Sequence, residues 1–149
     1  MNRRGFSAIE LLTVLVIVGI ITAFGIPRIR SAVIKSNVRS AKVALGTLVV
    51  KARAAAVSRG CTATMTLTSG TSGTVSISVC TVNGTGSQVL GGVDSLAARY
   101  SVYMRPSTST LAFDPRGLAV NYTTLVVGFS SNSISDSVIV NPLGQVVRQ

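Results

Sequence analysis

The sequence predicts an α+β protein in which a long, hydrophobic N-terminal helix packs on a small antiparallel β-sheet or sandwich domain. Three observations lead to this prediction: an apolar run at residues 11–26, apolar residues at helical spacing from residue 34 to residue 55, and alternating apolar and polar residues after Gly60. A chain of 149 residues has room for one modest domain and an appendage. The change of composition near residue 60 separates the two.

The apolar run LLTVLVIVGIITAFGI is interrupted only by two threonines. With residues 6–10 it reaches about 20 residues, the length that crosses the hydrocarbon core of a bilayer, so we expect a transmembrane helix. A cleavable secretory signal is the alternative, because Arg3 and Arg4 supply a basic start. Against that alternative, the run is long for the apolar region of a signal peptide.

The helix is expected to continue from Pro27 to about Arg59 and to end at Gly60, a residue type that accepts the left-handed C-cap conformation. Pro27 lacks a backbone donor, so a kink or a locally melted turn is expected there. The apolar stripe consists of Ile34, Val38, Ala41, Leu45, Leu48, Ala52 and Ala55, and a basic face beside it consists of Lys35, Arg39 and Lys42.

After Gly60 the sequence is typical of short antiparallel strands. The segments TATMTLT and TVSISV flank the turn-rich SGTSG and predict a hairpin. Residues 81–97 are Gly-rich and weakly patterned, and are predicted to form a loop. Further strands are predicted at residues 100–105, 111–113, 118–121, 124–129, 137–140 and 145–148.

The formal net charge of +10 is concentrated in one part of the chain. Eight basic residues lie between Arg28 and Arg59 with no acid among them, whereas the region after residue 60 has four arginines against three aspartates. The β domain is therefore almost neutral, and the whole-chain charge does not by itself indicate nucleic-acid binding.

Two cysteines, Cys61 and Cys80, fall in the β domain. In a domain of this size they predict a disulfide formed in an oxidising compartment, with two buried free thiols as the alternative. Strand alternation argues mildly against the bridge. If Met65 and Ile77 face inward, Cys61 points inward and Cys80 outward, unless a strand end or a bulge intervenes.

Glu10 is the only acidic residue before residue 94 and lies within the apolar segment. A carboxylate in hydrocarbon is costly and requires a partner. The alternative is that Glu10 lies at the interface and reaches toward water. We favour a charge partner on another chain.

The string Gly5-Phe6-Ser7-Ala8-Ile9-Glu10-Leu11-Leu12 resembles the class III signal of type IV pilins and type II secretion pseudopilins. The resemblance implies that prepilin peptidase cleaves between Gly5 and Phe6 and that Phe6 becomes N-methylphenylalanine. Glu10 then matches the fifth mature residue and Pro27 the proline of the helix kink. The implied partners are other pilins or pseudopilins in a helical filament, where Glu10 of a neighbouring subunit, or of the same subunit, pairs with the Phe6 amine.

The implied organisation is a leader peptide at residues 1–5, a transmembrane and filament-core helix at 6–26, an amphipathic continuation at 27–59 and a periplasmic β domain at 60–149. The protein would cross the inner membrane once. The positive-inside rule alone would place the β domain in the cytoplasm, because the basic residues after the span outnumber Arg3 and Arg4. The leader resemblance and the cysteine pair favour the periplasm.

The C-terminal half is similar to the GspH/FimT family of minor pilins and pseudopilins, through Leu111-Ala112-Phe113-Asp114-Pro115-Arg116-Gly117 and Leu143-Gly144-Gln145-Val146-Val147. This similarity implies a FimT-like minor pilin that takes part in pilus assembly or priming. The alternatives are a type II secretion pseudopilin of the H type and a pilus-tip subunit that binds DNA through a Gly-Arg-x-Arg element. Gln145 stands where the first arginine of that element should be, which leaves Arg148, with Arg116 or Arg105, as candidate DNA contacts.

The sequence does not predict an enzyme. It has no histidine, no cluster of carboxylates and no Gly-rich phosphate loop, and its aspartates are dispersed among turns. No cofactor is expected, and no metal site, because the two cysteines are better used as a bridge.

Overall fold

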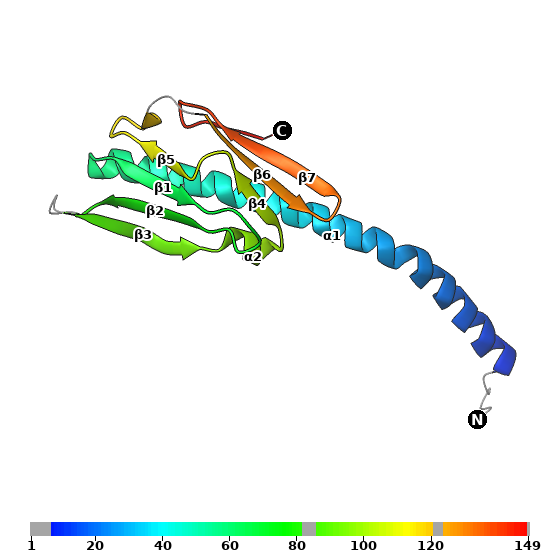
Figure 1. The fold of residues 1–149 in the computed structure, drawn as a ribbon. Helices are drawn as coiled ribbons and strands as arrows, with labels where there is room; N and C mark the ends of the chain where they lie inside the picture. The colour runs from blue at the N-terminus through cyan, green and yellow to red at the C-terminus, as the bar shows by residue number, and fades with distance from the viewer. Residues whose placement is uncertain (1–6, 82–85, 121–123, 149) are drawn as a thin grey trace. The chain divides into compact units, whose positions relative to one another are not determined.

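The computed structural model describes residues 7–81, 86–120 and 124–148 (Figure 1). The chain forms two compact units, Met1–Ile34 and Lys35–Gln149. Helix α1 (Ala8–Arg59) contributes its first part to the N-terminal unit and its second part to the C-terminal unit. The helix continues without a break through Pro27. Of the two expected alternatives at Pro27, the melted turn is therefore wrong.

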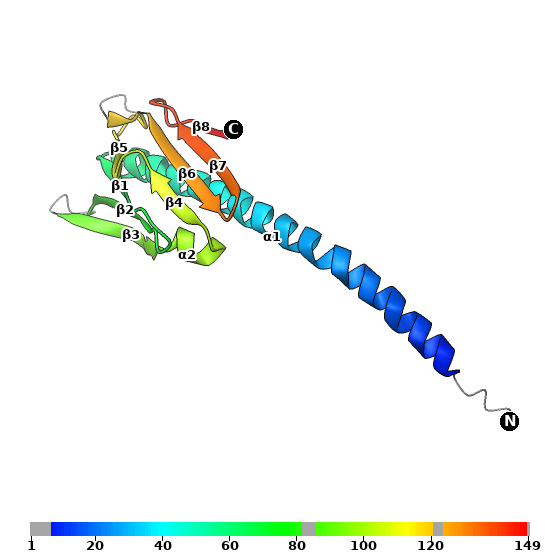
Figure 2. The same ribbon diagram turned by 45° about the vertical axis from the view of Figure 1, so that its right-hand side comes forward.

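The C-terminal unit contains two four-stranded antiparallel sheets and a short helix. One sheet has the order β3-β2-β1-β5 and the other has the order β4-β6-β7-β8. Figures 1 and 2 show both sheets in two views related by a 45° rotation. The elements are β1 (Ala63–Leu67), β2 (Val75–Cys80), β3 (Ser87–Asp94), α2 (Leu96–Tyr100), β4 (Tyr103–Pro106), β5 (Thr110–Phe113), β6 (Leu125–Ser131), β7 (Ile134–Val140) and β8 (Val146–Arg148). This architecture confirms the predicted α+β class.

The core forms where the inner faces of both sheets meet one face of α1. Val38, Leu45 and Val49 from the helix join a hydrophobic cluster with strand residues such as Met65 and Phe129, all of them buried. The predicted apolar stripe is confirmed at Val38, Ala41, Leu45, Ala52 and Ala55. Ile34 and Leu48, at its margins, are half-buried.

The end of α1 is fixed by backbone hydrogen bonds. Gly60 has a φ of 64°. Its N–H donates to the carbonyl of Val57 (3.4 Å), and the N–H of Cys61 donates to the carbonyl of Ala56 (3.3 Å). This pair of bonds is the Schellman motif, which requires a left-handed residue at the first position after the helix. The predicted helix end is confirmed.

The predicted hairpin between residues 62 and 79 is also confirmed, with Met65 opposite Ile77. A second hairpin joins β6 to β7, where Ser131 pairs with Ile134 across a two-residue turn. Asn132 in that turn has a φ of 51°, a conformation that asparagine tolerates better than most residues.

Three predicted segments differ from the structure in whole or in part. Part of the predicted loop at 81–97 is β3, which pairs with β2, and α2 follows it; residues 82–85 lie outside the described residues. The strand predicted at 100–105 begins only at Tyr103, because α2 extends to Tyr100. No strand is assigned from residue 118 to residue 120, where Ala119 makes a single bridge to Phe113; Asn121 is outside the described residues.

Cys61 and Cys80 are joined in a disulfide, with Cα atoms 6.3 Å apart. Cys61 lies in the turn between α1 and β1, so the alternation of strand side chains does not govern its direction. Cys80 is the last residue of β2 and belongs to its half-buried face. Strand alternation therefore does not oppose the disulfide, because Cys61 lies before the start of β1.

Candidate functional site

The first part of α1, within the N-terminal unit, exposes apolar side chains on all its faces. Ile9 is 72% exposed and Phe24 is 73% exposed. Among the described residues, α1 is the one helix long and apolar enough to cross a membrane, with a mean hydropathy of 2.5 over an 18-residue window. An apolar surface of this extent is costly in water and is stable only against lipid or other protein.

The hydroxyl groups of this segment bond to the helix itself. Thr13 Oγ1 donates to the carbonyl of Glu10 (2.9 Å), Thr22 Oγ1 to that of Val18 (2.8 Å) and Ser31 Oγ to that of Pro27 (3.1 Å). These bonds leave few polar groups that would need water, which suits a helix surrounded by an apolar medium.

Glu10 lies in the first turn of α1, and its backbone N–H donates to the carbonyl of Ser7 (3.0 Å). A carboxylate at a helix N-terminus interacts favourably with the helix dipole. The side chain is exposed, and within the part of the chain that the structure describes no ion pair involves it. Gly5 and Phe6, the predicted cleavage and methylation positions, lie outside the described residues.

In the C-terminal unit, two of the motifs that carry the GspH/FimT similarity meet at the same arginine of α1. Gly117 and Gly144 are buried, and both have positive φ, 81° and 71°. A Cβ atom added at Gly117 would lie 2.8 Å from Arg53 Nε, and one added at Gly144 would lie 3.0 Å from a ring carbon of Phe113 and 3.3 Å from Arg53 Cδ. The two glycine turns therefore pack on the Arg53 side chain.

The turn around Gly117 is organised by Asp114. Its Oδ1 accepts hydrogen bonds from the backbone N–H of Arg116 (2.9 Å) and of Leu118 (2.8 Å). Such a bond from an aspartate to the backbone two residues on is an Asx turn. The segment that resembles the family motif thus has a clear structural role in placing the chain against α1.

The structure does not bring the candidate DNA-contacting arginines together. Arg105 is in β4 and Arg148 in β8, and these two strands are the opposite edges of one four-stranded sheet. Three strand spacings separate them, about 14 Å. Arg116 is exposed in the turn after β5. Two or three arginines contact few phosphates, which weakens a nucleic-acid interface.

Each of the three aspartates has a structural partner. Asp94 forms an ion pair with Arg99 (2.8 Å), and Asp136 Oδ2 lies 2.5 Å from Lys42 Nζ. Asp114 organises the turn described above. Within the described ranges, no group of three metal-ligating side chains occurs.

Lys42 is the residue that the sequence pattern misplaced. It was predicted on a basic face with Lys35 and Arg39, but it is the one charged residue among the described buried ones, and its side chain is only 6% exposed. The heptad spacing from Lys35 to Lys42 contained no signal for burial. Its partner, Asp136, is 94 residues further along the chain.

No family model matches this chain, and no curated protein matches it. Among solved structures, a crystal structure of the type IV minor pilin FimU of Pseudomonas aeruginosa strain PAO1 has a TM-score of 0.62 and 17% sequence identity, covering 77% of this chain and 90% of FimU. The chain has the pilin fold. A second crystal form of FimU gives a TM-score of 0.54 and 15% identity, covering 74% of this chain and 91% of FimU. At this identity the likeness establishes the pilin fold, and the narrower GspH/FimT assignment stays a prediction.

Proposed function

We propose that this chain is a type IV pilus minor pilin of the FimT-like kind, processed by prepilin peptidase and incorporated into or priming a pilus. The observation that carries the proposal is the exposed apolar part of α1 with Glu10 as its one carboxylate, in a chain that has the pilin fold. Lipid or other protein must cover such a surface, and a filament subunit would be covered first by the membrane and then by the packed helices of the filament.

In this proposal residues 1–5 are removed, residues 6–26 anchor the subunit in the inner membrane, and residues 60–149 lie in the periplasm. The Phe6 amine released by cleavage is a cation in an apolar region, and Glu10 neutralises it. Pairing between neighbouring subunits sets their axial register, because a displaced subunit would leave both charges without a partner. A head-to-tail contact of this kind propagates into a filament.

The pilus is favoured over the type II secretion pseudopilus, because the solved structures similar to this chain are those of a type IV minor pilin. The small number of candidate arginines, Arg148 with Arg116 or Arg105, disfavours a DNA-binding role, because it gives few phosphate contacts.

The substitution Glu10→Gln tests the proposal. It removes the charge while keeping the shape, so the membrane level of the protein should be unchanged, while its amount in sheared pili should fall at least about tenfold. Thr13→Val, one turn further along the same helix, is the matched control and should enter pili normally. Both fractions are measured by quantitative immunoblotting. Normal incorporation of the Glu10→Gln protein would contradict the proposed role.

A further inference from the structure

The second part of α1 has an exposed face that its own β domain does not cover. It consists of Val43, Thr47, Val50, Ala54 and Val57, and is called the 43–57 face below. The spacings alternate between four and three residues, which places all five side chains along one line of the helix. Val50 is 59% exposed and Val57 is 53% exposed. Four of the five residues are apolar and none is charged.

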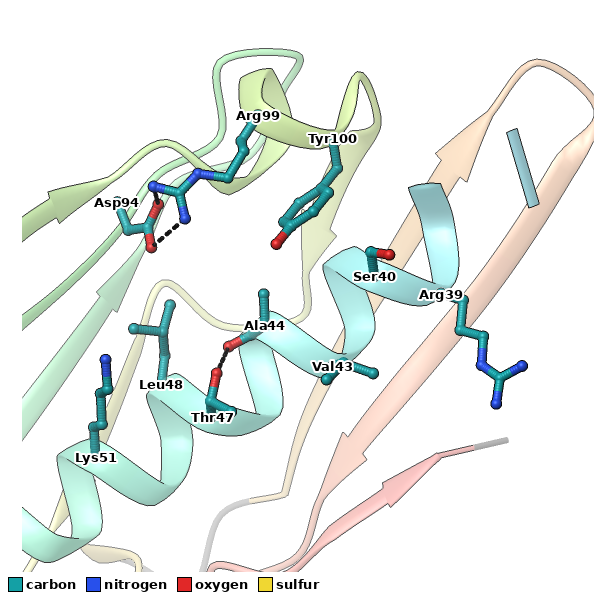
Figure 3. A pocket seen from close by; sticks show the side chains of 10 residues that line it. All are labelled: Arg39, Ser40, Val43, Ala44, Thr47, Leu48, Lys51, Asp94, Arg99 and Tyr100. Carbon is teal, nitrogen blue, oxygen red and sulfur yellow. Dashed lines mark hydrogen bonds and ion pairs between the residues drawn. The ribbon is translucent and has the colours of Figure 1, made fainter. Parts of the chain in front are cut away.

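Two shallow grooves adjoin this face, and Thr47 and Lys51 line both of them. One groove, of about 530 Å³, lies between α1 and the β3–α2 junction, where Asp94, Arg99 and Tyr100 line its far wall (Figure 3). The other, of about 350 Å³, is lined by Gly46, Val50 and Val146 among others. A second helix lying along the 43–57 face would therefore meet an open surface next to these grooves.

The charges around this face have one sign. At about 100° per residue, Lys51 lies on one side of the stripe and Arg53 on the other, and Arg39 lies at its N-terminal end. From residue 35 to residue 59 the helix has six basic residues and no acid. The nearest carboxylate in the wider groove, that of Asp94, is bound by Arg99 through both oxygens (2.8 and 3.3 Å).

These charges decide which partner fits. In paired helices the residues that flank an apolar seam select the partner, and like charges across the seam oppose association. A second copy of this chain would bring basic flanks against basic flanks. A helix with carboxylates beside its apolar seam would be attracted.

We propose that the 43–57 face is the docking surface for an acid-bearing helix of a different pilin-fold subunit, and that its basic flanks exclude a second copy of this chain. The inference rests on the proposed function and deepens it, because it specifies that the neighbour of this subunit along α1 is another protein.

Photo-crosslinking of the full chain in membranes tests the proposal with defined partners. Benzoylphenylalanine replaces Val50, and the same chain is co-expressed with a tagged second copy that is either native or carries Arg39→Glu and Lys51→Glu. Both of these basic side chains are exposed, so the changes avoid the core. A third copy, with Arg39→Ala and Lys51→Ala, separates the effect of attraction from that of lost repulsion. Benzoylphenylalanine at Thr66, on the exposed face of β1, is the positional control.

The charge-reversed copy should be captured from position 50 about fivefold more than the native copy, with the neutral copy between them, and position 66 should show no preference. Equal capture of the native and reversed copies would overturn the charge selection. Capture from position 50 no greater than from position 66, for all three copies, would overturn the docking surface itself. Neither result depends on filament incorporation, so the role proposed for Glu10 stands or falls separately.

Discussion

Because Gly117 has no side chain, its turn can lie directly against Arg53 of helix α1. The space that a Cβ would need is taken by Arg53, whose stem and guanidinium lie against the backbone of two turns. Gly117 belongs to the motif through which the chain resembles the GspH/FimT family. The structure assigns it a packing role that sequence spacing alone could not reveal, because Arg53 is 64 residues before Gly117.

Gly117→Ala should therefore cost more stability than the same change at a glycine with a similar φ and free space. Gly60, with a φ of 64° and no atom within 4 Å of an added Cβ, is the matched control. We expect Gly60→Ala to lower the free energy of unfolding by about 1 kcal/mol and Gly117→Ala by about 2–3 kcal/mol. In an Arg53→Ala background the two costs should become similar.

Guanidinium unfolding of residues 35–149 measures these differences. The fragment is suitable because every described buried hydrophobic residue lies between Val38 and Val140. If Gly117→Ala cost no more than Gly60→Ala in the native background, contact with Arg53 would not be what restricts this position.

At the scale of elements, α1 and β7 are joined by the ion pair between Lys42 and Asp136. The ammonium is almost fully buried, whereas the aspartate side chain is 36% exposed, so the two partners are not equivalent. Removing the carboxylate leaves a buried cation without its counter-charge. Removing the ammonium leaves a carboxylate that water can reach.

Asp136→Asn should accordingly lower the free energy of unfolding by about 2–3 kcal/mol, while Lys42→Met should lower it by about 1 kcal/mol or less. The amide of the introduced asparagine would still present an oxygen to the Ser137 N–H, which donates to Asp136 Oδ1 at 2.7 Å in the native chain, so the comparison isolates the charge. The same unfolding measurement applies. An equal cost for both variants would mean that burial of Lys42 does not set the energetics of this pair.

The elements that could be predicted are those with strong local signals. The helix end at Gly60 follows from a residue type suited to positive φ, and the first hairpin follows from clean alternation around a Gly- and Ser-rich turn. Strand β3 was missed because it is an edge strand with exposed residues on both faces, including Val89 and Val93, so its apolar residues do not alternate. The Asn83-Gly84 pair before it was the available hairpin signal.

At the scale of the whole molecule, the order of strands was beyond the reach of sequence patterns. β1 pairs with β5 although β2, β3, α2 and β4 come between them in the chain, and β4 pairs with β6 across β5, which belongs to the other sheet. Such pairings depend on which apolar faces meet on α1, and local alternation carries no information about them. The burial of Lys42 could not be predicted either, because it depends on the packing of α1 against β7, where its partner Asp136 lies.

Processing and compartment are tested together by the intact mass of the protein purified from membranes, combined with N-terminal peptide mapping. We expect a chain that begins at N-methylated Phe6 and is about 2 mass units lighter before reduction than after it, because the Cys61–Cys80 bond replaces two thiols. The reduced sample is the internal control. A chain that begins at Met1 with free thiols would identify an ordinary membrane-anchored domain instead.

The disulfide at the end of α1 also has a mechanical consequence. Cys61 follows the helix directly and is bonded to Cys80 in the sheet, while Val38, Leu45 and Val49 hold the preceding turns in the core. A tensile load applied along α1 in the direction of its N-terminus would have to shear the whole packed face at once, and any slip would then be stopped by a covalent bond. The disulfide thus links the C-terminal end of α1 to the sheet, at the end of the helix farthest from the applied force. The contacts between helix and sheet therefore cannot break one after another from that end.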